Sequence, residues 1–292
     1  MMKKNKKYNL LSLLCVFQFV WLQSLSTLNS IPISSRDLSF SGGGGAMITN
    51  EISMNPASIQ LFTKSLSLNT QILPADISLF SIEALFPYDK KIYFSSISSL
   101  NWGTLKDGIT NNSFSANDIK LTGGLKYKIS HISSFGVSSS YILSKIQSFT
   151  AQSILFTIGI QSELKKNHSG LGLVIRNLGF QFDSFNNLKE MPSFQIQVSG
   201  YIKPKYLSAL TFSDIIIEKN VINKILITGI EFYTKNNLIV RFSNSGIFFK
   251  KYQLNSVALG LQLNKNNWIL DIASRNLISI GIVNSISIKK QF

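Results

Sequence analysis

The stretch at residues 118–130, DIKLTGGLKYKIS, alternates apolar and polar side chains for longer than a typical soluble strand. Its apolar members share one parity: Ile119, Leu121, Leu125, Tyr127 and Ile129. Its polar members share the other: Lys120, Thr122, Lys126 and Lys128. Because successive side chains of a strand point to opposite faces, this pattern predicts a ribbon with one apolar and one polar face. At ~3.3 Å per residue it is long enough to cross a bilayer at a tilt, with Leu121 toward lipid and Lys126 toward a solvated lumen.

Composition agrees with a membrane barrel. After residue 30, no apolar run reaches the ~18 residues that a membrane helix needs. Charged residues make up 15% of the 292 residues, below the ~25% of soluble domains. We therefore predict an all-β fold, a transmembrane antiparallel β-barrel of about 14 strands with an N-terminal plug segment. The alternative is a soluble β-sandwich, which the strand length disfavours.

The predicted strands follow one another with short polar turns between them, and their boundaries carry an uncertainty of about two to four residues. Asn and Lys-Asn sequences in the turns, such as Asn236-Asn237, tolerate the positive φ that tight hairpins need. The expected ranges are 66–72, 77–86, 91–102, 118–130, 135–145, 153–165, 169–182, 193–203, 207–217, 224–234, 237–249, 255–263, 267–274 and 278–290.

The chain divides into three parts. Residues 1–26 have a lysine-rich start, an apolar stretch and the small residues Ser24 and Ser26, which predicts a signal peptide. Residues 27–64 form the predicted plug, and residues 65–292 form the predicted outer-membrane barrel. The only cysteine, Cys15, lies inside the signal, so we expect neither disulfides nor cysteine-ligated metals.

The predicted plug contains four consecutive glycines, residues 42–45, and the pair Asn55-Pro56. Glycine permits positive φ and close backbone approach, and we expect positive φ at Gly44 and Gly45. Asn-Pro favours a turn. The alternative is a flexible linker, against which stands the apolar content of the segment.

The formal net charge of +15 raises the question of nucleic acid. The lysines lie in pairs at predicted turns or singly on polar faces, without a helix that gathers them for groove binding. We therefore expect no nucleic-acid partner. The prediction that we retain is attraction to outer-membrane lipid, in particular to anionic headgroups.

The sequence offers no catalytic, cofactor-binding or metal-binding motif. His131 and His168 lie in predicted turns without a neighbouring cluster of ligands, and adjacent strand residues such as His168 and Ser169 point apart. We expect no enzyme activity and no cofactor. Arg176 and Asn177, inside a predicted strand, are candidates for the barrel lumen.

The last predicted strand ends at an aromatic residue. Ile286, Ile288 and Phe292 share one parity, which faces lipid in the predicted barrel. A terminal aromatic on this face resembles the insertion signal of outer-membrane barrels, and Phe292 is our candidate for it.

Residues 31–58, IPISSRDLSFSGGGGAMITNEISMNPAS, resemble the N-terminal signature of the PorV/PorQ family of FadL-like outer-membrane proteins. Residues 114–124, 140–154 and 172–204 are similar to the PorQ branch. The matching positions of the plug and turn motif are Ser35, Arg36, Gly44, Gly45, Ala46, Asn55, Pro56 and Ala57.

This resemblance implies a location in the outer membrane of a Gram-negative cell and a non-enzymatic part in type IX protein secretion. The barrel would anchor surface machinery that processes and attaches cargo, with protein components of that complex as partners. The alternative is a FadL-type transporter of hydrophobic small molecules. Serines expected on inner faces argue for a polar lumen rather than an apolar tunnel: Ser95, Ser99, Ser138 and Ser140.

Overall fold

The structure, a computed structural model, describes residues 28, 31–52, 54–59, 63–106, 113–165, 168–185, 194–218, 224–235, 237–248 and 252–292. The predicted signal peptide at residues 1–26 lies outside these ranges. Among the described residues, no helix is long and apolar enough to span a membrane.

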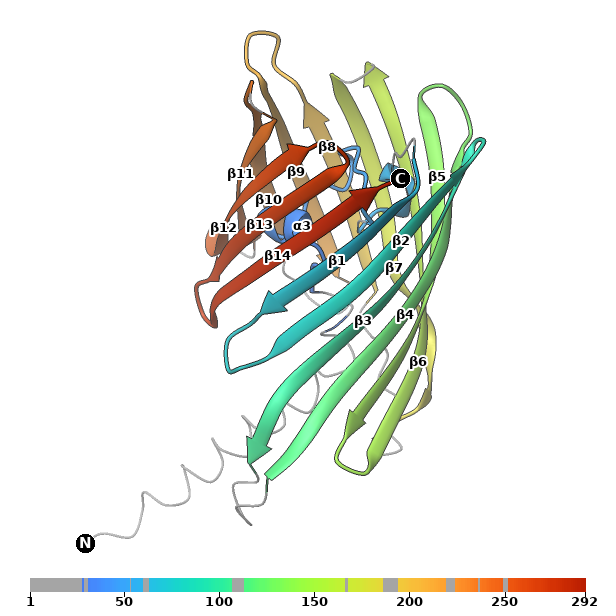
Figure 1. The fold of residues 1–292 in the computed structure, drawn as a ribbon, viewed down its shortest axis with the longest axis vertical. Helices are drawn as coiled ribbons and strands as arrows, with labels where there is room; N and C mark the ends of the chain where they lie inside the picture. The colour runs from blue at the N-terminus through green and yellow to red at the C-terminus, as the bar shows by residue number, and fades with distance from the viewer. Residues whose placement is uncertain are drawn as a thin grey trace, which may run out of the picture.

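Fourteen antiparallel strands form one closed barrel, in which β1 pairs with both β2 and β14 (Figure 1). The predicted all-β antiparallel barrel of about 14 strands is confirmed, and each predicted strand corresponds to one strand of the barrel. The strands are β1 (Ser65–Ile72), β2 (Ser78–Tyr88), β3 (Lys91–Lys106), β4 (Ser113–Lys128), β5 (Ser133–Ile146), β6 (Phe149–Lys165), β7 (Ser169–Asp183), β8 (Gln195–Ile202), β9 (Ala209–Glu218), β10 (Lys224–Tyr233), β11 (Leu238–Phe248), β12 (Tyr252–Lys265), β13 (Trp268–Leu277) and β14 (Gly281–Gln291).

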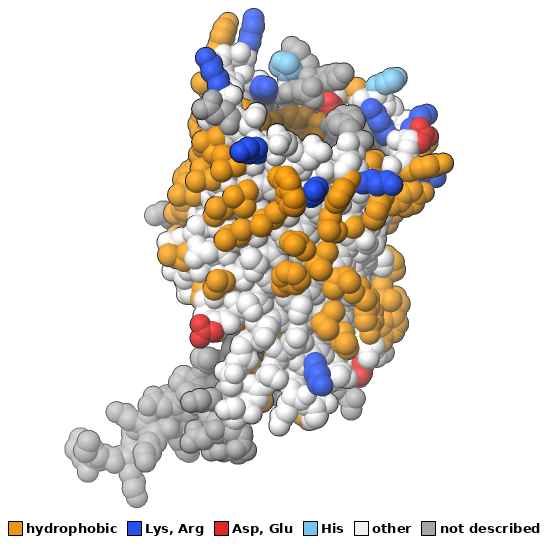
Figure 2. All heavy atoms as spheres, viewed as in Figure 1, with side chains coloured by type: hydrophobic (Ala, Val, Ile, Leu, Met, Phe, Trp, Pro, Cys, Tyr) orange, Lys and Arg blue, Asp and Glu red, His pale blue; other side chains and the backbone are white. Residues whose placement is uncertain are grey.

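The alternation of side chains sets which face of the wall points inward. In β4, Leu121 is 44% exposed on the outside of the barrel, whereas Lys120 and Lys126 are each 8% exposed on the inside. Large apolar side chains recur over the outer surface, and Figure 2 shows them in orange across the middle of the face in view. Serine, asparagine, glutamine and charged residues recur among the buried inner positions.

The two ends of the barrel differ in their chain connections. At one end, here called the terminal end, β1 begins beside the end of β14, and the N–H of Phe292 donates to the carbonyl of Lys64 over 2.9 Å. At the other, here called the distal end, β3 runs on to Lys106 and β4 starts at Ser113. Figure 1 shows these two strands extending past β1, β13 and β14.

The extension was missing from the predicted boundaries because its alternation is out of step with the outward apolar parity of the wall: Phe114 lies on the even parity that faces inward in β4. The register of β3 against β4 shifts between Asn101 and Thr104. Beyond this irregularity, the two strands remain paired as Thr104 with Ser115, Leu105 with Phe114 and Lys106 with Ser113. The polar sequence here reads as a loop, yet the hairpin continues as strand.

The inward assignment of two serines was wrong. Ser95 and Ser99 lie on the outward parity of β3, and Ser96 and Ser98 are the buried ones. The reason is that Phe94 packs inward with Ile59 of the N-terminal chain, which fixes even-numbered residues of this part of β3 on the inside. Ser138 and Ser140 of β5 do face inward, where they line an internal cavity.

Residues 31–59, here called the inner segment, lie within the barrel rather than beside it. The segment contains the short helix α3 (Ser35–Ser39) and the 3-10 turn η1 (Pro56–Ser58). Phe40 and Met47 are fully buried against Phe212 and Ile227 on the inner face of β9 and β10. Figure 1 shows the blue inner segment surrounded by the wall, with α3 behind β13 and β14.

Candidate functional site

Helix α3 is held against the β11–β14 wall by serine contacts. The Ser34 side chain caps the helix by accepting from the Asp37 N–H. The Ser35 N–H donates to the Ser287 hydroxyl over 2.9 Å, and the Ser35 and Ser285 hydroxyls bond over 2.8 Å. Gly260 of β12 faces Ser39, so the helix approaches the wall where a side chain would collide with it.

A buried network of charges lies beside the helix. Arg241 Nε donates to Glu231 over 2.6 Å, its NH1 donates to Asp271 over 2.5 Å, and its NH2 donates to Gln262. Each of these charged side chains is at most 5% exposed. Because every buried charge here has an ionic partner and hydrogen bonds, the network is self-compensating.

The inner segment joins this network through Arg36 and Phe40. Arg36 Nε lies 4.0 Å from Glu231, and Arg36 donates to the carbonyl of Ile48 over 3.3 Å. The ring of Phe40 contacts two guanidinium groups, with its centre 5.0 Å from that of Arg36 and 5.5 Å from that of Arg241. Arg36, a residue of the predicted motif, therefore connects α3 to the barrel wall and to the next turn of its own segment.

A second ionic contact ties the middle of the segment to β14. Lys289 lies 3.3 Å from the Glu51 carboxylate and donates to the carbonyl of Asn50 over 2.6 Å. Burial alone would raise the pKa of Glu51, but the nearby Lys289 and Arg36 outweigh it and hold this pKa below its usual range.

The glycine turn follows the helix. Gly42 and Gly44 have φ of 82° and 78°, so the expectation of positive φ is met at Gly44. It is wrong at Gly45, which is needed for another reason: a Cβ there would lie 2.7 Å from the Ser199 hydroxyl. The Gly45 N–H donates to Asp214 over 3.0 Å. The close approach of the Ser199 and Gln197 side chains, rather than the dihedral, favours glycine at Gly45.

The Asn55-Pro56-Ala57 turn packs directly on the backbone of the opposite wall. Asn55 accepts from the Ala57 N–H over 2.9 Å and donates to the carbonyls of Gly45 and Ile160. Its neighbours in the wall are the paired Gly136 and Gly159, whose added Cβ atoms would collide with Pro56-Ala57 and with Asn55. Asn55 thus links the two motif turns to each other and to β6.

Besides Gly260, three more wall glycines lie where the inner segment touches the wall, and sequence reasoning missed them. Gly136, Gly159 and Gly172 all lie at inward positions of long strands, and Gly172 faces Gly45 and Ala46. A strand glycine weakens a sheet unless another backbone approaches it closely. Glycines on the inward-facing parity of the strands could therefore have predicted where the inner segment contacts the wall.

Arg176 and Asn177 lie side by side on the inside of β7. They face Thr157 at an irregularity where β7 holds an extra residue, and Asn177 has φ of 62°. Both side chains are therefore buried, although neighbours on a regular strand would point apart. Arg176 donates to Gln197 of β8 over 2.5 Å. Beyond Arg176, β7 pairs with β6, whereas β8 begins at Gln195.

A cavity of about 60 Å³ separates the inner segment from the β3–β7 wall. The inner segment contributes apolar side chains, among them Ile52 and Met54, together with Asp37. The wall contributes Lys120 and Arg176. Burial raises the pKa of Asp37 to about 7, because the neighbouring cations Arg36 and Arg176 offset only part of the loss of water.

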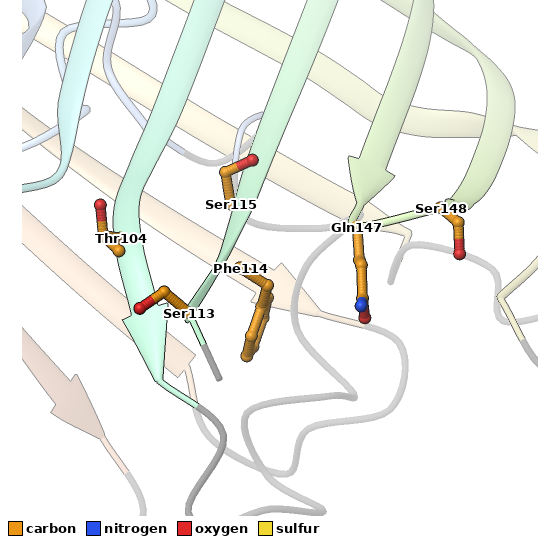
Figure 3. Close-up of a pocket in the computed structure, with 6 residues that line it drawn as sticks. All are labelled: Thr104, Ser113, Phe114, Ser115, Gln147 and Ser148. Atoms are coloured by element: carbon orange, nitrogen blue, oxygen red, sulfur yellow. The ribbon is translucent and has the colours of Figure 1, made fainter. Parts of the chain in front are cut away.

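An open groove of about 530 Å³ lies at the distal end, on the extended hairpins (Figure 3). The Gln147 N–H donates to the carbonyl of Ser115 over 3.1 Å and ties the β5–β6 turn to β4. Serine and threonine hydroxyls with a single aromatic ring give a surface suited to contact with another polypeptide. The groove is lined by Thr104, Ser113, Phe114, Ser115, Gln147 and Ser148.

The remaining candidates lie at the terminal end. Phe292 is exposed at the last position. His131 and His168 lie exposed at the β4–β5 and β6–β7 connections. Within the ranges that the structure describes, no group of three or more His, Cys, Asp or Glu residues is placed to hold a metal ion.

The comparisons with known proteins identify the fold. No family model and no curated protein sequence matches the chain. A TodX mutant described as a monoaromatic hydrocarbon channel aligns over 90% of this chain and 100% of its own, with 11% identity and a TM-score of 0.69. The Pseudomonas putida toluene transporter TodX covers 86% of this chain and 98% of its own, with 11% identity and a TM-score of 0.64. A FadL homologue from Pseudomonas aeruginosa covers 90% and 99%, with 10% identity and a TM-score of 0.67. The two TodX structures are described as a channel and a transporter, and this chain shares the FadL-like barrel fold of all three, as expected from its sequence.

Proposed function

We propose that this chain is a non-enzymatic outer-membrane barrel of the PorV/PorQ type that serves type IX protein secretion as an anchor for surface machinery. The observation that carries the proposal is the way in which the motif residues are used. Ser35, Arg36, Gly45 and Asn55 each bond or pack to fix the inner segment in the lumen. A lumen filled in this manner suits a rigid support.

The distal groove is the surface that we propose for a protein partner of the secretion complex. It lies at the end opposite the two termini of the barrel, on hairpins that project beyond their neighbours (Figures 1 and 3). A projecting, rigid edge with hydroxyl groups can be contacted without any change in the barrel.

Copurification tests this proposal. Ser115→Arg with Gln147→Arg places two cations in the groove, and Ser279→Arg places one in the exposed β13–β14 turn at the same end as a control. We expect the groove variant to assemble normally, to lose its copurifying proteins from detergent-solubilised outer membrane and to reduce surface display of cargo. Unchanged partners and display in the groove variant contradict docking at this groove.

The inner segment gives a second test. Gly45→Val and Asn55→Ala remove two contacts of the segment. Barrel assembly is measured by heat-modifiable mobility on gels, and cargo display is measured on the cell surface. Loss of display with intact assembly supports a direct part in secretion, whereas normal values for both show that the segment is not needed for it.

Transport of hydrophobic small molecules is the second candidate. It is favoured by the fold likeness to hydrocarbon channels, by the cavity beside Lys120 and Arg176, and by the irregularity of β7 next to it. Purified protein in liposomes would then accelerate uptake of a monoaromatic hydrocarbon, and Met54→Trp in the cavity would slow it. Uptake equal to that of protein-free liposomes excludes this candidate.

The location is tested by extraction. An outer-membrane barrel stays in the membrane fraction under salt and carbonate, and release into the soluble fraction contradicts it. We further propose that Phe292 is read during insertion, so its deletion should lower the membrane level of a chain that is synthesised normally. Equal membrane levels with and without Phe292 rule out this role.

A further inference from the structure

The two ends of the barrel differ strongly in charge. At the terminal end, the described acidic residues of the turns and strand ends are Asp89 and Glu163, and lysines greatly outnumber them. At the distal end, by contrast, the described cations Lys106, Lys145, Lys224 and Arg275 stand against three acidic residues, Asp76, Asp183 and Glu218. Figure 2 shows the blue side chains gathered toward the end that carries the C-terminus. The terminal-end lysines are Lys64, Lys90, Lys91, Lys128, Lys203, Lys205, Lys235, Lys265 and Lys290.

Several of these lysines stand beside aromatic rings. Lys290 Nζ lies 4.7 Å from the centre of the Trp268 ring and 5.6 Å from that of Phe292. Across three neighbouring strands, Lys91 is paired with Tyr88 on one side and with Tyr127 on the other. All three of these side chains are exposed on the outer surface. The clusters lie on β2–β4 and on β13–β14, which β1 alone separates in the closed barrel.

Moving from these clusters toward the middle of the barrel, the outward faces of β3 and β14 become apolar. On β14, Ile288 and Ile286 continue the outward face below Lys290, and on β3, Tyr93 and Ile97 continue it below Lys91. Aromatic rings with a cation at the edge of an apolar band are the arrangement that suits a membrane–water interface. The lysine stems can lie along the rings while the ammonium groups reach the polar layer.

The charge of these lysines is available to a ligand outside the barrel. Among the described residues, the ion pairs are formed by Arg36, Arg241 and Lys289 with inner acids, and none includes an outward lysine of the terminal end. Asp89 lies exposed in the β2–β3 turn, but no described ion pair joins it to a lysine, and lysines remain in excess at this end.

We infer that the terminal end carries a lysine–aromatic girdle that binds the anionic headgroups of phospholipids in the leaflet around it. Lipid is favoured over a soluble acidic partner because Lys91 and Lys290 project sideways from the wall at the edge of the apolar band, at headgroup height. This inference depends on the proposed membrane location.

The experiment uses the full barrel in nanodiscs of phosphatidylethanolamine with a fluorescent phosphatidylglycerol probe. The variant K91Q/K290Q removes one lysine from each cluster, and K145Q/K224Q removes two exposed lysines from the distal end as the matched control. At low salt we expect apparent affinity for the probe to fall about fivefold per girdle lysine removed, and to stay within about twofold in the control. Raising salt from about 50 to 500 mM should abolish the difference.

Equal probe affinity in the two variants overturns the inference. Displacement of the probe by a soluble polyglutamate peptide as effectively as by unlabelled phosphatidylglycerol also overturns it, because that result indicates a general anion-binding surface. A protein that fails to enter nanodiscs overturns the membrane location together with the girdle. A protein that enters them and shows no preference for phosphatidylglycerol overturns the girdle alone.

Discussion

Strands β11–β14 and strands β3–β7 present different inner faces to the same segment. The first wall holds α3 through hydroxyl contacts and through the Arg241 network, whose charges are all paired. The second wall contacts η1 closely at Gly136 and Gly159, but elsewhere leaves a cavity with Lys120 and Arg176 beside it. Here they are called the holding wall and the cavity wall.

The difference separates two tasks that one barrel can perform. The inner segment is bonded to the holding wall and is partly separated from the cavity wall by the cavity. It is therefore fixed in position while part of its surface remains accessible within the lumen. An anchor needs the first property, and a transporter needs the second. The outer faces of the two walls are alike, since both carry large exposed apolar side chains such as Leu121 and Ile272.

The largest expected effect breaks the holding wall. Arg241→Met leaves Glu231 and Asp271 buried without their partner, and should lower the unfolding free energy in lipid vesicles by about 3 to 5 kcal/mol. Arg176→Met on the cavity wall should cost about 1 to 3 kcal/mol, because its described hydrogen bond is to the neutral Gln197. Denaturant titration of both variants measures the difference. Equal losses would mean that the two walls hold the segment alike.

The next effect tests whether the outer faces are equivalent. In the proposed membrane, Leu121→Arg and Ile272→Arg each place a charge against lipid and should each cost about 2 to 4 kcal/mol if at mid-depth. If the two variants lose similar unfolding free energy, the difference between the two walls lies in their inner faces alone. A cost near zero at either site contradicts its contact with lipid.

The sequence was informative about the wall and less so about its interior. Alternation identified each strand, since an outer apolar parity is imposed on every strand by the same surroundings. The face of Lys126 was predicted, but its side chain was expected to lie in a solvated lumen. Lys126 instead donates to the carbonyl of Ile59, so Lys126→Ser removes a buried bond to the inner segment.

The interior depends on register, which alternation leaves undetermined. Glu231, Arg241 and Asp271 each have inward parity, but their network requires that Glu231 pair with Arg241 across the β10–β11 hairpin and that Asp271 pair with Gln262. A shift of two residues preserves every parity and separates the charges. The contacts of Arg36 with this network require, in addition, the position of a segment that is far away in sequence.

A pH effect sharpens the contrast at Asp37, which faces the cavity. Its pKa of about 7 lies above the unfolded value of ~4, so its contribution to stability is present at low pH and is lost as pH rises toward 7. Asp37→Asn should remove a pH-dependent loss of about 2 to 3 kcal/mol between about pH 5 and 8. Unfolding free energies of both proteins across this range measure it, and parallel pH profiles would show that Asp37 stays ionised in the folded protein.

The smallest effect concerns the close contact on the cavity wall. Gly136→Val places a side chain where Pro56 and Ala57 lie, which should shift η1 and cost about 1 to 3 kcal/mol through overpacking. Gly123→Val is the matched control, because a Cβ at Gly123 on the outward parity of β4 meets no described atom within 4 Å. That control should be neutral or slightly stabilising, since valine favours strand and lowers the entropy of the unfolded chain. Protease accessibility of the inner segment, measured beside unfolding, distinguishes a shifted η1 from a general loss of stability. If Gly136→Val leaves both measurements at the wild-type value, the turn does not rest on the wall backbone, and the cavity wall would then hold the segment even less than the structure indicates.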